Sequence, residues 1–111
     1  MTLQRQNRSE KMADHYILDE NKRPVKISNL AEWSAWMDTT EKRVVAQDRV
    51  GESFVSTVFL GVDHDFSIIG NPILFETIIF GGKLDGELER YHTYEEAKQG
   101  HAEILARLKQ I

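Results

Sequence analysis

The sequence predicts an α+β fold: a twisted antiparallel sheet of four or five strands with two helices, one short near the N-terminus and one C-terminal. Three observations favour this class. Residues 54–61 and 73–80 are apolar runs with the length and the β-branched and aromatic content of buried strands. Turn residues bound both runs, and each of two segments with helical spacing begins at a capping residue.

The size and composition of the chain indicate one folded domain. A chain of 111 residues buries enough surface for one core, and its apolar fraction of 41% is that of folded proteins. Residues 1–12 are predicted to form a disordered, basic N-terminal arm, because three of the first eleven side chains are basic and one is acidic. Residues 13–111 are predicted to form the single α+β domain.

Charge and cysteine content exclude several classes of function. The formal net charge of −4 argues against nucleic-acid binding, because an acidic surface repels phosphate backbones. No apolar run approaches the roughly 20 residues of a membrane helix, so no membrane partner is expected. The chain has no cysteine, which excludes disulfides and thiolate metal sites and is compatible with the cytoplasm, the location that we expect.

The N-terminal part of the domain is predicted to contain a hairpin and the short helix. Residues 15–27 hold two short apolar runs around a polar tip that suits a turn. A helix then begins at Ser28 or Asn29, with Glu32 in the capping-box position, and runs to about Asp38. Its apolar residues recur at helical spacing and indicate one core-facing side: Leu30, Trp33, Trp36 and Met37.

Four strands are predicted to follow in antiparallel order. Residues 43–50 alternate between apolar and polar, as in a half-exposed strand. Residues 54–61 and 73–80 are apolar on both sides, which predicts a central position with both faces covered. The glycine-rich segment 81–86 is interpreted as a hairpin turn, and residues 87–92 as a short polar strand.

The C-terminal helix is predicted to begin after Thr93, with Glu96 in the capping-box position. Gly100 in its middle is unfavourable by about 1 kcal/mol relative to alanine, so it is expected to allow a close backbone approach. Two helices cover only one face of such a sheet. Because the other face would stay apolar and uncovered, we expect a homodimer packed through sheet faces or edges.

Asp63 and His64 are the first candidate ligand-binding residues. They follow the buried run 54–61, so a rigid support would fix their positions. With Asp65 they offer oxygen and imidazole donors that suit a divalent ion. Neighbouring side chains of an extended segment point to opposite sides, however, so a polar turn explains the same residues, and no metal site is predicted.

Glu76 and Arg90 are the second pair of candidates. Glu76 falls on a strand face that is otherwise apolar, where a carboxylate requires a partner. Arg90 of the next strand can supply it, and Arg49 is an alternative. Either the two charges only satisfy each other, or Glu76 accepts hydrogen bonds from a ligand while Arg90 binds its phosphate or carboxylate. No nucleophile–base set is recognisable, so no catalytic residue and no cofactor are predicted.

Several sequence motifs, when they occur together, are specific to one protein family, and the match spans nearly all of the chain from Tyr16 onward. The motifs are YILDEN at 16–21, EWSAW at 32–36, VSTVFLGVDH at 55–64, LFETIIFGG at 74–82 and RYHTYEEA at 90–97. In these segments the chain resembles a family of small proteins encoded by bacteriophages and prophages. The resemblance implies a setting inside an infected or lysogenic bacterial cell. It implies no particular activity.

The sequence therefore supports a small accessory protein that acts as a non-enzymatic binder. In the phage setting, its role would be to inhibit host defence, either by sequestering a nucleotide-like signal or by binding a defence protein. Two alternatives stay open. One is a metal-dependent hydrolase or nuclease that uses the loop with Asp63 and His64, together with Glu76. The other is an acidic mimic of DNA, for which the interspersed basic residues leave little net charge.

Overall fold

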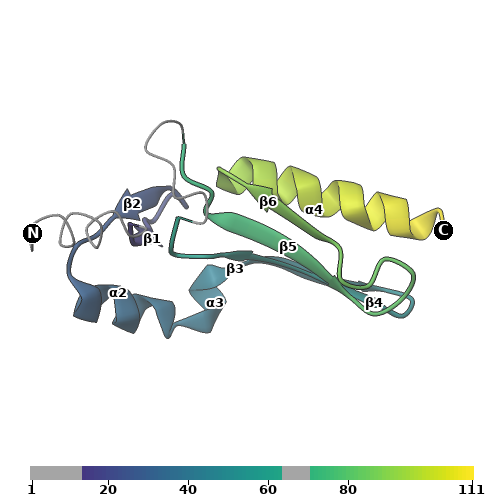
Figure 1. The fold of residues 1–111 in the computed structure, drawn as a ribbon, viewed down its shortest axis with the longest axis horizontal. Helices are drawn as coiled ribbons and strands as arrows, with labels where there is room; N and C mark the ends of the chain where they lie inside the picture. Colours follow the sequence, from purple (N-terminus) through teal and green to yellow (C-terminus); the bar gives the residue numbers. More distant parts are fainter. Residues whose placement is uncertain (1–13, 64–70) are drawn as a thin grey trace, which may run out of the picture.

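The computed structural model describes residues 14–63 and 71–111 and has the predicted α+β class (Figure 1). The described residues form three helices and two antiparallel sheets, one of two strands and one of four. The predicted basic arm 1–12 and the candidate residue His64 lie outside the described residues.

The predicted hairpin forms, but as a sheet of its own rather than as part of the main sheet. Strand β1 (Tyr16–Leu18) pairs with β2 (Pro24–Lys26), and Asp19 Oδ1 accepts hydrogen bonds from the backbone of the turn at Asn21 and Arg23. The hairpin is attached to the end of the main sheet through backbone contacts, including a 2.8 Å hydrogen bond from Tyr16 N to Gly61 O.

Helix α2 (Leu30–Met37) closes the core at the hairpin end. Asn29 is its N-cap and accepts from Glu32 N, as the capping pattern predicted. The expected apolar side is only partly buried, since Leu30 is 57% exposed. Trp36 packs edge-on against Phe59 at 5.6 Å, which places it against the core, as its helical spacing predicted. A one-turn helix that the sequence did not predict, α3 (Thr40–Arg43), leads into the main sheet.

The main sheet has the strand order β3-β4-β5-β6, and all neighbours are antiparallel. Its strands lie within about two residues of the predicted positions. The two apolar runs occupy the predicted central places. The bounds are Val44–Val50 for β3, Ser53–Phe59 for β4, Phe75–Phe80 for β5 and Leu88–Tyr91 for β6.

The loop between β5 and β6 is the predicted turn. Gly81 and Gly82 have φ values of 85° and 78°, which residues with a side chain rarely adopt. A Cβ atom at Gly82 would also overlap Ser53 Oγ at the start of β4. The glycines therefore serve the close approach of this loop to the neighbouring turn.

Helix α4 (Tyr94–Lys109) packs along one face of the sheet and contacts all four strands (Figure 1). Thr93 and Glu96 form the predicted capping box. Gly100 is buried where the Tyr91 ring meets the helix, so the predicted close approach at this glycine is confirmed.

The core beneath α4 has two apolar clusters, one around Phe59 and Phe75 and the other around Val55, Ile79 and Ile104. Register places three polar residues between the two clusters: Thr57, Thr77 and His101.

Candidate functional site

The face of the main sheet opposite α4 carries all the strand candidates of the sequence analysis. Because side chains alternate along a strand, the register fixes which residues share this face. We call it the open face. It consists of three rows across the sheet: Val44, Val58, Glu76 and Arg90; Gln47, Ser56, Ile78 and Leu88; and Arg49, Phe54 and Phe80.

The open face is largely apolar and partly exposed. Phe80 is 51% and Leu88 46% exposed. The Phe54 and Phe80 rings lie side by side, with centroids 6.4 Å apart, and the Arg49 guanidinium lies 5.5 Å from the Phe54 centroid. The expectation that both faces of the central strands are covered is therefore met on one side only by the described part of this chain, where α4 supplies the cover.

Glu76 and Arg90 form the predicted ion pair on this face. They are direct register partners, and Arg90 Nε donates to Glu76 Oε2 at 2.9 Å. The Glu76 side chain is 11% exposed and that of Arg90 40%. The other proposed partner, Arg49, lies over Phe54 instead.

The geometry of this pair leaves hydrogen-bonding capacity unused. A guanidinium has five N–H donors, and among the described residues only Nε of Arg90 has a partner. The two terminal nitrogens of Arg90 are therefore available to a carboxylate or phosphate, while Glu76 holds the guanidinium in place.

Asp63 has a structural contact that explains its burial. It is 7% exposed, lies beyond the end of β4, and its Oδ1 accepts from Ile73 N at 3.0 Å. This bond braces the two ends of the connection between β4 and β5. Within the described residues, no three histidine, aspartate or glutamate side chains are placed to hold a metal ion. His64, which the metal alternative also uses, lies outside that part of the chain.

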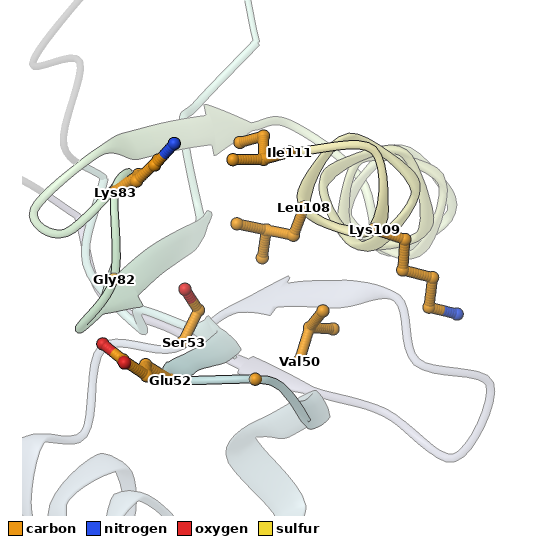
Figure 2. Close-up of a pocket in the computed structure, with 9 residues that line it drawn as sticks. Val50, Glu52, Ser53, Gly82, Lys83, Leu108, Lys109 and Ile111 are labelled. Atoms are coloured by element: carbon orange, nitrogen blue, oxygen red, sulfur yellow. The ribbon is translucent and has the colours of Figure 1, made fainter.

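Three cavities lie away from the Glu76–Arg90 pair. The largest, about 570 Å³, opens where the β3–β4 turn, the β5–β6 loop and the end of α4 meet. Figure 2 shows Leu108, Val50 and Ile111 around it, with Lys83 and Glu52 toward its edge. A second, of about 520 Å³, lies beside β6 and α4 and is lined by four glutamates, and a third, of about 380 Å³, lies beside the hairpin and Trp36. A ligand at the ion pair would therefore lie on a sheet surface and not in any of these three cavities.

Sequence reasoning missed an Asp–His–Thr arrangement under α4. Nε2 of His101 lies 2.8 Å from Asp48 Oδ2, and Nδ1 lies 2.7 Å from Thr57 Oγ1. The spacing is that of a nucleophile, a base and an orienting carboxylate. Thr57 is 0% exposed, however, and its hydroxyl also forms a hydrogen bond with Thr77, so no substrate reaches that hydroxyl. The arrangement is structural in this form.

No protein-family model, curated protein or solved structure matches the chain. Across residues 14–63 and 71–111, no helix is both long enough and apolar enough to span a membrane.

Proposed function

We propose that this protein is a non-enzymatic binding protein whose open face docks onto a partner protein. The observation that carries this proposal is the apolar open face itself, on which Phe80 and Leu88 are about half exposed. Contiguous apolar surface of this kind is typical of interaction sites. Phenylalanine and arginine, both present in the rows of the open face, are among the residues enriched in such interfaces.

The shape of the open face favours a protein over a nucleotide. Small-molecule sites are concave and bury most of the ligand surface. The Glu76–Arg90 pair instead joins β5 to the edge strand β6, outside the three cavities described above. A flat partner surface can cover such a face, whereas an isolated nucleotide would stay largely solvated.

Charge indicates the chemistry of the partner. The open face carries Arg49 and Arg90 against the single carboxylate of Glu76, on a chain with a net charge of −4. We therefore expect an apolar partner surface bordered by an acidic side chain that meets the free nitrogens of Arg90. In the phage setting that the resemblance implies, the partner is a host defence protein of the bacterial cytoplasm.

A second copy of this chain is the competing occupant of the same face, as the predicted homodimer requires. Two open faces packed together would bring four arginines and two glutamates into one interface, which is unfavourable unless the charges interleave. Light scattering at micromolar concentration separates the two occupants. A monomer mass near 12.8 kDa supports a foreign partner, and a dimer that Phe80→Glu dissociates assigns the face to self-association.

The proposal is tested by comparing interface variants on immobilised full-length protein. We expect a bacterial protein to bind the wild type at a fixed stoichiometry. Its binding should be abolished by Phe80→Glu and by Leu88→Glu, and weakened by Arg90→Ala. Ala102→Glu, an exposed position on α4 away from the open face, is the matched control and should bind normally. Equal binding by Phe80→Glu and wild type would show that the open face is not the docking surface.

A further inference from the structure

A chain of hydrogen bonds runs through the interface between α4 and the sheet, and the proposed binding function makes no use of it. At its centre, the His101 ring contacts Asp48 of β3 through Nε2 and Thr57 of β4 through Nδ1. Thr57 Oγ1 in turn contacts Thr77 Oγ1 of β5. His101 is 4% exposed and both threonines are 0% exposed, so water does not replace these partners.

The chain continues to the opposite edge of the sheet. Thr77 Oγ1 lies 3.0 Å from the Tyr91 hydroxyl of β6, and that hydroxyl lies 3.2 Å from Glu89 Oε1. Burial raises the pKa of Tyr91, so its hydroxyl keeps the proton that it donates. Since β3 and β6 are the two edge strands, the chain spans the full width of the sheet.

The number of hydrogens on each group fixes the direction of the hydrogen bonds in this series. A hydroxyl has one hydrogen, so each threonine can donate to only one of its two neighbours. If His101 is neutral, its ring hydrogen on Nε2 goes to Asp48. Nδ1 then accepts from Thr57, which accepts from Thr77, which accepts from Tyr91. Tyr91 has no hydrogen left for Glu89 in this arrangement.

A second ring proton leaves the bond from Nε2 to Asp48 unchanged and reverses the other three. Protonated His101 donates to Asp48 and also, through Nδ1, to Thr57. The buried Thr57 must then donate to Thr77, and Thr77 to Tyr91, because no other side-chain acceptor contacts these hydroxyls in the described part of the chain. Tyr91 is left to donate to Glu89. Both arrangements give every buried polar atom of this series a hydrogen-bond partner, and in the second the Asp48 carboxylate faces the charged His101 ring.

We propose that this series of hydrogen bonds is a proton-sensitive relay. Protonation of His101 reverses the hydrogen bonds from Thr57 to Tyr91 and turns the Tyr91 hydroxyl toward Glu89. Glu89 is exposed and lines the cleft of about 520 Å³ beside α4. The relay therefore couples the protonation of a buried histidine to the hydrogen bonding of a surface carboxylate at the other edge of the sheet.

The charged groups around the relay are few. Asp48 comes from β3, and Glu89 and Tyr91 come from β6. On α4 itself Glu103 acts on Tyr91 through its charge. The residues that β4 and β5 direct toward α4 do not titrate near neutral pH: Ser53, Val55, Thr57 and Phe59 of β4, and Phe75, Thr77 and Ile79 of β5. A through-space effect on Glu89 should therefore also be seen at Glu103, which is not a member of the chain.

The test is a pH titration of the full-length protein by NMR, in which the ring nitrogens of His101 and the carboxyl carbons of Glu89 and Glu103 are followed together. We expect neutral His101 to carry its hydrogen on Nε2. The Glu89 signal should shift in step with the His101 ring and by more than the Glu103 signal. In Tyr91→Phe, which keeps Glu89 but removes the hydroxyl, the Glu89 shift should fall to the size of the Glu103 shift.

Thr77→Val interrupts the series of hydrogen bonds one step earlier and keeps the Tyr91–Glu89 contact. It should therefore reduce the Glu89 shift as Tyr91→Phe does, by an independent route. Three results would overturn the proposal: a neutral His101 with its hydrogen on Nδ1, a Glu89 shift that survives both variants, or a Glu89 shift that follows the ring of His92, the residue next to Tyr91, instead of His101.

Discussion

The two faces of the main sheet both mix apolar and polar side chains, but they differ in how deeply those side chains are buried. The face under α4 has polar residues at its centre, where Thr57, Thr77 and His101 separate two apolar clusters. The open face has aromatic and aliphatic residues in the same strands, with Phe80 about half exposed. Burial alone therefore does not account for where the apolar side chains of β4 and β5 lie.

The two faces contribute to stability in different ways. Under α4, every polar side chain at the centre has a hydrogen-bond partner, so the interior tolerates polarity at little expense. On the open face, apolar side chains cover one another across the strands and gain only part of the possible burial. Stability should depend mainly on the first face and binding on the second, and substitutions can test this division.

The largest effect is expected for Phe59→Ala on the covered face. Phe59 is 0% exposed and contacts both Trp36 and Phe75. Removal of a buried phenylalanine ring should lower the free energy of unfolding by about 3–5 kcal/mol, because a cavity remains. Urea unfolding of wild type and variant measures it. A loss below that of a conservative surface change would mean that α2 and α4 do not close over this ring.

Helices α2 and α4, the turns and the central strands could be predicted from the sequence because the patterns that mark them are local. Capping residues such as Asn29 and Thr93, the turn glycines and the apolar runs act over a few neighbouring positions, and each was found where expected. The separate hairpin sheet was not predicted, since it depends on backbone contacts with distant residues such as Gly61. Helix α3 was not predicted either. A short, half-exposed turn such as α3 has no apolar stripe to reveal it.

Gly100→Ala should have the next largest effect on the covered face. In a free helix this change stabilises by about 1 kcal/mol, because alanine is the better helix former. Here the new Cβ atom would overlap the Tyr91 ring, and overpacking of this kind should destabilise by about 1–3 kcal/mol.

The sign of the stability change caused by Gly100→Ala decides between these two effects, and the same substitution in a Tyr91→Ala variant tests whether the ring is the cause. In Tyr91→Ala the ring is gone, so Gly100→Ala should there be neutral or stabilising. Thermal unfolding of the four proteins gives the comparison. A destabilisation that persists without the ring would assign the effect to the helix and not to the contact.

Arg90→Ala should have a smaller effect, between those of the covered face and of the exposed ring on the open face. It leaves the largely buried carboxylate of Glu76 without its partner, which should destabilise by about 1–2 kcal/mol, reduced by the partial exposure of Arg90. Glu76→Gln in the same chain should recover most of this loss, since the charge is removed with its partner. A double variant no more stable than Arg90→Ala would show that Glu76 is solvated without Arg90.

The candidate site was only partly predictable, for reasons of sequence distance. Glu76 stood out as a carboxylate on an apolar strand, and register brought Arg90 opposite to it as expected. The alignment of Asp48 and Thr57 with His101 left no signal, because the three residues come from β3, β4 and α4 and are joined only by the packing of the helix on the sheet. Periodicity identifies which face a residue shares but not which helix residue will meet it.

The smallest effect on stability should come from Phe80→Ala, although the same type of residue is removed as in Phe59→Ala. Phe80 is 51% exposed and lies at the end of β5, so its truncation leaves no cavity and should change the free energy of unfolding by no more than about 0.5 kcal/mol. Binding should respond in the opposite order, because an exposed aromatic ring that becomes buried in an interface can contribute more than about 2 kcal/mol to association. The measurement is a pair of values for each variant, an unfolding free energy and an affinity for the partner or the second copy. If Phe80→Ala unfolds as readily as Phe59→Ala, the open face is part of the folding core, and its proposed role as a docking surface fails.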